Sequence, residues 1–320
     1  MSSSGGTRAI IAALLANIGI AIAKFVAFLI SGSSSMLAES VHSLADSGNQ
    51  LLLLLGGRKA KKKADKEHPF GYGRERYVYA FVVSIILFSV GGVFSIYEGI
   101  EKIANPHPIE MPWVPLAVLV VAIALEGFSL RTAIKESNHT RGKQNWVQFV
   151  RRAKAPELPV VLLEDTAALT GLAFALVGVS LSAVTGNGLW DGISTLFIGA
   201  LLVLVAVVLG IETKSLLVGE GAGDADVARI RSAIEGTAKV DRLIHMKTLY
   251  LGPEELLVAA KIALAPESEL RDVAATINEA EANIRAAVPI ARVIYLEPDV
   301  YVPPVDVETH TAAIVIKSAD

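Results

Sequence analysis

The sequence predicts an α-helical membrane protein with six spans, followed by a small cytoplasmic α+β domain. Hydrophobic residues make up 52% of the 320 residues and charged residues only 19%, which is unusual for a soluble chain of this length. The apolar residues are gathered in blocks of about 20, the length that crosses a bilayer as a helix. After Gly219 the composition changes to that of an ordinary soluble domain.

The six apolar blocks predict a transmembrane domain over residues 1–218. They are Ala9–Ile30, Met36–Leu55, Tyr77–Ile103, Trp113–Ile134, Val160–Val184 and Leu189–Leu217. The separators at 58–76 and 135–154 are rich in Lys and Arg, whereas the other three contain neither residue. Because positive loops stay on the cytoplasmic side, both of these connections and both termini are expected there. We expect an integral, multi-pass protein of the bacterial cytoplasmic membrane.

Residues 219–302 are expected to form the cytoplasmic domain, with the order helix, strand, strand, helix, strand (αββαβ). Apolar residues at helical spacing predict the helices, and a Gly-Pro turn at 252–253 joins the first two strands. The expected elements are the helix Asp224–Glu235, the strands Leu243–Leu251 and Leu256–Leu264, the helix Glu269–Ala287 and the strand Ala291–Leu296. The tail, 303–320, is given no predicted structure.

Ionisable residues inside two of the blocks indicate a metal site. Each costs about 2.5–3.5 kcal/mol to insert into a membrane, so each requires a reason. Glu39, His42 and Asp46 in the second block are three and four residues apart, which places them on one face of a helix. The fifth block contains Glu164 and Asp165. Imidazole and carboxylate ligands suit Zn²⁺ and related ions. The alternative is structural: a lone histidine that hydrogen bonds between helices and acids that snorkel towards water.

Other polar residues in the blocks have structural interpretations. Lys24 either neutralises the carboxylates or snorkels, and the residues alone leave both open. Glu126 lies deep in the fourth block, where we expect a partner such as Arg131, with a proton relay as the alternative. Asp191 at the start of the sixth block is expected to cap a helix or to complement its dipole. Amides that we expect to hydrogen bond between helices are Asn17, Asn49 and Gln50.

Several functional classes are disfavoured. The net charge of -3 offers no basic signature for nucleic acid. Cysteine is absent, which removes thiolate ligands and disulfides. No HExxH pattern or nucleophile arrangement supports a membrane hydrolase, so we expect neither an enzyme nor a resident cofactor.

Two strings resemble a known family. Residues 35–46, SMLAESVHSLAD, and residues 68–73, HPFGYG, after a basic stretch are similar to the cation diffusion facilitators. The likeness extends from about residue 8 to 299 and is strongest to the branch containing the mitochondrial zinc transporter of animals. It implies a proton-coupled antiporter that exports divalent metal from the cytoplasm, with Zn²⁺ as substrate and H⁺ as coupling ion. It also implies a homodimer joined through the C-terminal domain.

The resemblance also implies a ligand set. The family's transport site has two residues four apart on the second span and two on the fifth. His42 and Asp46 match the first pair and Asp165 matches one member of the second, but Val161 stands at the remaining position. Glu164, or water, would complete the coordination.

A second site of the family, in the loop between spans two and three, would retain Asp65 and His68 here. Tyr72 replaces its second histidine, so weak binding at most is expected.

Three other functions compete with zinc export. One is transport of another divalent ion such as Mn²⁺, Fe²⁺ or Co²⁺, and one is transport of an organic cation with the acids as charge partners. The third is a membrane-embedded metal sensor that moves no ion. Only a metal carrier should be protected from unfolding by metal in detergent and also move zinc into vesicles under a pH gradient: the organic-cation carrier fails the first test and the sensor the second.

Overall fold

The computed structural model describes residues 3–303, with side chains from residue 17 onward. The expected tail therefore lies, beyond its first residue, outside the described part. The chain forms two compact units. One contains the residues up to 221 together with 249–256, and the other contains 222–248 and the residues from 257 on.

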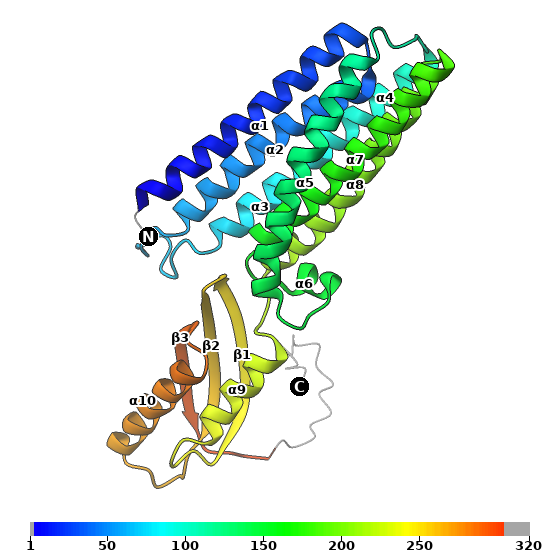
Figure 1. The fold of residues 1–320 in the computed structure, drawn as a ribbon. Helices are drawn as coiled ribbons and strands as arrows, with labels where there is room; N and C mark the ends of the chain where they lie inside the picture. The colour runs from blue at the N-terminus through cyan, green and yellow to red at the C-terminus, as the bar shows by residue number, and fades with distance from the viewer. Residues whose placement is uncertain (1–2, 304–320) are drawn as a thin grey trace. The chain divides into compact units, whose positions relative to one another are not determined.

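The first unit is a bundle of long helices (Figure 1). Each apolar block lies within one helical stretch, and the stretches extend beyond the blocks because polar flanking residues continue the helical hydrogen bonds. The helices are α1 (Ser3–Ser31), α2 (Ser34–Lys59), α3 (Glu75–Ile86), the π-helical segment η1 (Leu87–Val93), α4 (Phe94–Ala104), α5 (Trp113–Arg141), α6 (Trp146–Arg152), α7 (Glu157–Thr185) and α8 (Leu189–Val218).

Four helical stretches in the described part of the chain are long and apolar enough to cross a membrane, which indicates a multi-pass protein. They are Glu75–Ala104, Trp113–Arg141, Glu157–Thr185 and Leu189–Val218. In α1 the segment available for this comparison is the apolar stretch Asn17–Ser31. Helix α2 is 26 residues long, but its polar and ionisable residues lower its hydropathy.

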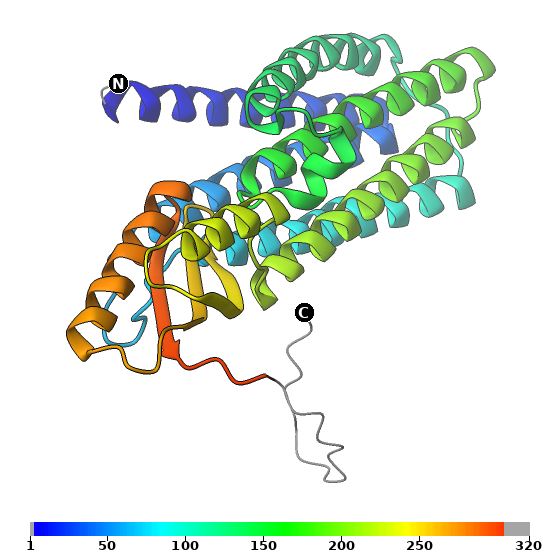
Figure 2. The ribbon, with the colours of Figure 1, turned by 90° about the horizontal axis from the view of Figure 1, so that it is seen from below.

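Close helix packing positions α2 and α7 near the centre of the bundle. Helix α1 packs on α2 and α5, α7 packs on α5 and α8, and α4 packs on α8, as Figure 2 shows for α1 and α5 and for α4 and α8. Glycines allow the α4–α8 contact: a Cβ on Gly99 would lie 2.8 Å from the backbone nitrogen of Leu196, and one on Gly199 2.8 Å from that of Ile96. Small residues at such contacts let helix backbones approach closely in membranes.

The start of α2 is fixed by a carboxylate from another helix. Asp191, in the first turn of α8, is fully buried and accepts hydrogen bonds from the Ser34 backbone N–H at 2.7 Å and the Ser33 hydroxyl at 2.8 Å. The backbone N–H and the hydroxyl of Ser35 donate to it as well. Asp191 therefore caps a helix, as its position suggested, but the helix is α2 and not its own.

The connection at 135–154 contains more helix than the sequence pattern indicated. Helix α5 continues to Arg141, and α6 forms where a plain separator was expected. A capping box starts α6: the Gln148 backbone N–H donates to Asn145 Oδ1 at 2.7 Å, and the Asn145 N–H donates back to Gln148 Oε1 at 3.2 Å. These reciprocal bonds satisfy two N–H groups that the helix start leaves free.

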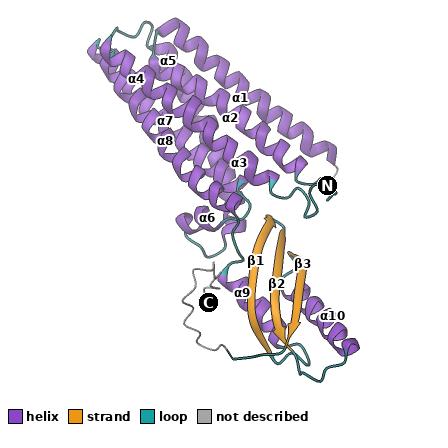
Figure 3. Cartoon of the chain, turned by 180° about the vertical axis from the view of Figure 1, so that it is seen from behind, coloured by secondary structure: helices purple, strands orange, loops and turns teal. Residues whose placement is uncertain are grey.

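The residues from 222 on contain a three-stranded sheet with strand order β1-β2-β3. Its elements are α9 (Asp224–Glu235), β1 (Arg242–Gly252), β2 (Glu255–Ala263), α10 (Leu270–Ala287) and β3 (Ala291–Asp299). The Leu264 N–H donates to the Asp299 carbonyl, and Lys261 pairs with Glu297 and Asp299, so β3 runs parallel to β2. Helices α9 and α10 lie on one side of the sheet (Figure 3), and each contains a fully buried isoleucine, Ile230 in α9 and Ile284 in α10.

Candidate metal site

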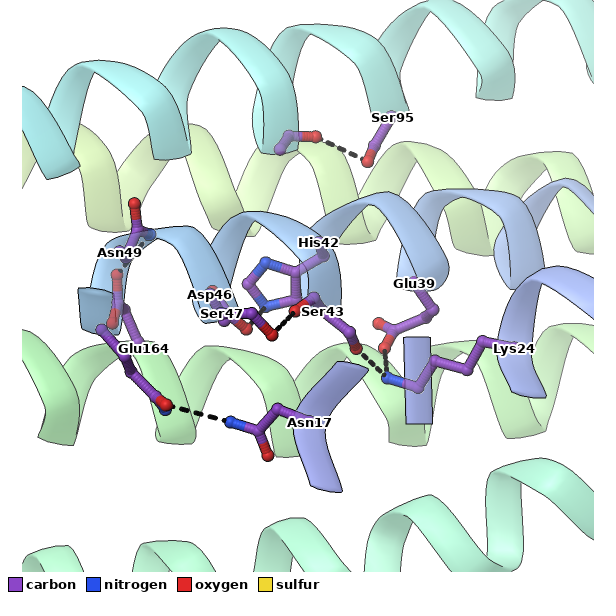
Figure 4. Close-up of polar contacts among 12 residues, drawn as sticks. Asn17, Lys24, Glu39, His42, Ser43, Asp46, Ser47, Asn49, Ser95 and Glu164 are labelled. Atoms are coloured by element: carbon purple, nitrogen blue, oxygen red, sulfur yellow. Dashed lines mark hydrogen bonds and ion pairs between the residues drawn. The ribbon is translucent and has the colours of Figure 1, made fainter. Parts of the chain in front are cut away.

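Helix α2 contributes an imidazole and a carboxylate that have few partners. His42 Nε2 lies 3.4 Å from Asp46 Oδ2, one helical turn away, and the two side chains adjoin in Figure 4. His42 is 1% exposed. Neither ring nitrogen of His42, nor Asp46 Oδ1, has a hydrogen-bond partner among the described residues. An unsatisfied buried polar atom costs about 1–3 kcal/mol, so these atoms favour a ligand.

The third helical stretch changes geometry beside this imidazole. The π-helical segment η1 contacts α2, and a Cβ on Gly91 of η1 would lie 4.0 Å from His42 Nδ1. The Ser95 hydroxyl donates to the Gly91 carbonyl at 2.6 Å (Figure 4). Single π-helical turns inside α-helices are frequent at functional sites.

Helix α7 contributes two adjacent acids, each held by a neutral donor from a neighbouring helix. Asn49 Nδ2 of α2 donates to Glu164 Oε1 at 2.8 Å. The Ser129 hydroxyl of α5 donates to Asp165 Oδ2 at 2.9 Å. Both acids are buried, and neither faces a Lys or Arg partner among the ion pairs of the described residues. Their second oxygens are therefore available to a cation.

A small polar cavity brings acids of three helices together. Its volume is about 20 Å³, which is enough for roughly one water-sized particle. Carboxylates on its wall come from α2, α5 and α7, namely Asp46, Glu126, Glu164 and Asp165. The remaining lining residues are Asn17, Ile20, Ser43, Gln50, Ser129 and Val161. Three of the four ligand candidates for the transport site thus line one space.

The side chains do not form a closed cage in this conformation. His42 is not among the residues that line the cavity and reaches it only through Asp46. Within residues 17–303, no three His, Asp or Glu side chains are gathered closely enough to hold an ion. Glu164 and Asp165 instead accept hydrogen bonds from the neutral donors Asn49 and Ser129. Enclosing an ion requires these side chains to converge.

The cavity wall distinguishes the candidates on α7. Val161 lines the cavity but has no ligand atom, whereas Glu164 supplies a carboxylate to the same space. Glu126 is an additional acid that was expected to pair with Arg131, and no such pair is present among the described residues. Its depth in the fourth block was the only signal of a role here.

Two other polar residues of α1, Asn17 and Lys24, bond to side chains of α2. Asn17 Nδ2 donates to Gln50 Oε1 at 3.2 Å, as expected. Lys24 is buried and does not snorkel: its Nζ lies 2.9 Å from Glu39 Oε2 and donates to the Ser43 hydroxyl (Figure 4). Lys24 therefore neutralises a carboxylate, that of Glu39.

The loop between α2 and α3 places a lysine at the second predicted site. His68 Nδ1 lies 3.6 Å from Asp65 Oδ1. The Tyr72 hydroxyl and Lys62 Nζ donate to Asp65 Oδ2 at 2.7 and 3.1 Å. The Tyr72 hydroxyl, the His68 backbone N–H and Lys62 hold the pKa of the Asp65 carboxyl well below its usual range. The ammonium of Lys62 thus supplies the positive charge at a site where only weak metal binding was expected.

Comparison with known proteins identifies relatives of this chain. A family model described as the cation efflux transmembrane domain matches residues 10–218. The human mitochondrial proton-coupled zinc antiporter is 32% identical over 241 residues, which are 75% of this chain and 42% of that protein. Metal tolerance protein C4 of Arabidopsis thaliana is 30% identical over 259 residues, 80% of this chain and 56% of that protein. The magnetosome protein MamM of Paramagnetospirillum magneticum is 24% identical over 255 residues, 75% of this chain and 72% of that protein. The chain thus spans about half the length of the first two relatives.

Proposed function

This chain belongs to the cation efflux family, and we propose that it moves a divalent transition-metal ion, Zn²⁺ before others, across a membrane in exchange for protons. The observation that carries the proposal is the cavity on which Asp46, Glu164 and Asp165 meet, with the unpartnered imidazole of His42 beside Asp46. These four side chains are the proposed ligands. The 32% identity to a protein named as a zinc antiporter supports the choice of ion.

The ligand chemistry favours zinc over harder ions. Zn²⁺ binds imidazole nitrogen and carboxylate oxygen at about 2.0–2.2 Å in four-coordinate sites. Mg²⁺ and Ca²⁺ prefer oxygen ligands, so the imidazole nitrogen of His42 binds them more weakly than it binds Zn²⁺. Fe²⁺ and Co²⁺ share the preference for nitrogen in part and are the nearest competitors. Glu164 takes the place of the ligand that Val161 does not provide.

Competition between metal and protons provides the coupling. An imidazole must be neutral and a carboxylate ionised to bind a metal, so protons compete with the ion for these ligands. When the site faces the more acidic side, a proton on His42 or on a carboxylate weakens the cage and the ion leaves. When it faces the other side, the proton leaves and metal binds again. The result is metal transport against an inward flow of protons.

The membrane topology follows from loop charge. We propose six spans, formed by α1, α2, the stretch from α3 to α4, α5, α7 and α8, with the basic connections 58–76 and 135–154 on the cytoplasmic side. The transport direction is then export from the cytoplasm. We also propose that the chain forms a homodimer through residues 219–302, where β3 presents a 58% exposed Tyr295.

Reconstituted vesicles with an imposed pH gradient test this function. Zinc should move when the gradient is present, and His42→Ala, Asp46→Ala and Asp165→Asn should reduce the flux to background. Glu98→Gln is the matched control, because it removes an acid from a membrane helix outside the cavity and should leave the flux unchanged. Near-normal zinc flux by Asp46→Ala contradicts the site assignment.

The same preparation separates the rival functions. A metal sensor would bind zinc and move none, and an organic-cation carrier would gain no stability from zinc in detergent. Running Zn²⁺, Mn²⁺, Fe²⁺ and Co²⁺ in parallel identifies the preferred ion. Glu164→Gln gives the test of the fourth ligand: loss of about tenfold or more in zinc affinity supports it, and an unchanged affinity assigns that position to water.

A further inference from the structure

Helix α2 contains a second buried acid that the site described above does not use. Glu39 and Lys24 are both fully buried, and Lys24 Nζ lies 2.9 Å from Glu39 Oε2. The same ammonium donates to the Ser43 hydroxyl at 2.8 Å. Figure 4 shows Lys24 reaching both residues of α2 from α1, next to His42. Lys24 therefore contacts only one oxygen of Glu39, and its second acceptor is the Ser43 hydroxyl.

The other oxygen of Glu39 has no hydrogen-bond partner within the part of the chain whose side chains are described. It faces Gly171 of α7, where a Cβ would lie only 2.7 Å from Oε1. The buried carboxylate of Asp191 differs from that of Glu39, because donors from Ser33 and Ser34 satisfy both of its oxygens. No donor from residues 17–303 reaches Glu39 Oε1, although burying an unpaired carboxylate oxygen is unfavourable.

The unpartnered ligand atoms of α2 belong to residues at helical spacing. Glu39 Oε1, both ring nitrogens of His42 and Asp46 Oδ1 all lack hydrogen-bond partners among the described side chains. Residues 39, 42 and 46 share one helix face, and at a rise of about 1.5 Å per residue they are about 4.5 and 6 Å apart along the axis. The cavity lies at the Asp46 end of this series. Glu39 lies at the other end, nearer the start of α2.

We propose that Glu39 is a further cation ligand, masked by Lys24, that receives the divalent ion after it leaves His42 and Asp46. The inference rests on the proposed function, because it describes a later step on the same path. As the ion arrives, Lys24 gives up Glu39 and keeps its bond to Ser43, so neither the ammonium nor the carboxylate is left alone in the bilayer. Lys24 is then a tethered cation that occupies the exit position whenever the metal does not.

Zinc binding to the detergent-solubilised full chain tests the masking. In Lys24→Met the Glu39 carboxylate is free, and the protein should bind one more Zn²⁺ per chain than the unsubstituted protein. The added site should disappear in the double variant Lys24→Met/Glu39→Gln. Lys102→Met is the matched control, since Lys102 is 1% exposed and donates to the Gly32 carbonyl away from Glu39, and its zinc stoichiometry should not change. Unchanged stoichiometry in Lys24→Met overturns the proposal.

Zinc flux through the double variant gives a second test that does not depend on the folding of Lys24→Met. The double variant contains no unpaired buried charge, so a purely structural pair predicts normal transport. An exit ligand predicts flux reduced about tenfold or more while the affinity at His42 and Asp46 stays within about threefold. Normal flux in the double variant refutes the proposed role of Glu39 and leaves the proposed transport function standing. Absence of zinc binding and flux in the unsubstituted protein refutes the proposed function instead.

Discussion

Replacing Asp191 with alanine should destabilise the membrane unit far more than an ordinary helix cap. The carboxylate accepts the backbone N–H groups of Ser34 and Ser35 at 2.7 and 3.3 Å and the Ser33 hydroxyl at 2.8 Å, with no exposure to solvent. Alanine leaves two buried backbone N–H groups without acceptors, at about 1–3 kcal/mol each. The hydroxyls can rotate to other acceptors. We therefore expect a loss of about 2–6 kcal/mol in the free energy of unfolding.

Equilibrium unfolding in mixed detergent micelles, followed by circular dichroism, measures this loss. Asn187→Ala is the matched control, because Asn187 is exposed and its Oδ1 accepts a single backbone N–H at the start of α8, that of Leu189, at 3.0 Å. The Asn187→Ala variant should lose about 1 kcal/mol in the free energy of unfolding. Since Asp191 fixes the start of the helix that carries His42, its variant should also weaken zinc binding. Equal destabilisation by the two variants would refute the reasoning.

Three further results are expected. Val161→Asp adds a carboxylate to the cavity wall one turn before Asp165, so zinc affinity measured by calorimetry should rise about tenfold or more while vesicle flux slows; unchanged affinity would argue against a cage at the cavity. Tyr72→Phe removes a hydrogen bond to Asp65, so the pKa of that carboxyl, followed by NMR, should rise towards its ordinary value of about 3.9. Because this pKa is depressed in the folded loop, the stabilisation that Asp65 provides is present above about pH 3.9 and is lost as the pH falls through the lower, folded value. Zinc binding should weaken as the pH falls, because protons compete with the ion for His42 and the carboxylates, and His42→Ala should release fewer protons on binding zinc.

The helical stretches and the chemical identity of the candidate ligands could be predicted from the sequence for a physical reason. Apolar blocks of membrane length and acids within them are rare signals with few interpretations. The three- and four-residue spacing of Glu39, His42 and Asp46 fixes one helix face without any tertiary information. Adjacent acids in the fifth block pointed to α7 in the same way.

Contacts between helices could not be predicted, because they depend on how each helix is rotated about its axis. Asp191 lies 157 residues from Ser34, and only the packed bundle shows which helix it caps. The presence of Glu126 on the cavity and the pairing of Lys24 with Glu39 depend on rotation in the same way. The π-helical turn at η1 has no local sequence signature, since its geometry is set by the helices packed against it.

X-ray absorption at the zinc K-edge of the metal-loaded protein examines the proposed ligands directly. The expected first shell contains about one imidazole nitrogen and carboxylate oxygens at about 2.0–2.2 Å, and the imidazole signal should vanish in His42→Ala. A shell of oxygen alone, or an imidazole signal that survives in His42→Ala, would contradict a transport site built on His42, Asp46, Glu164 and Asp165.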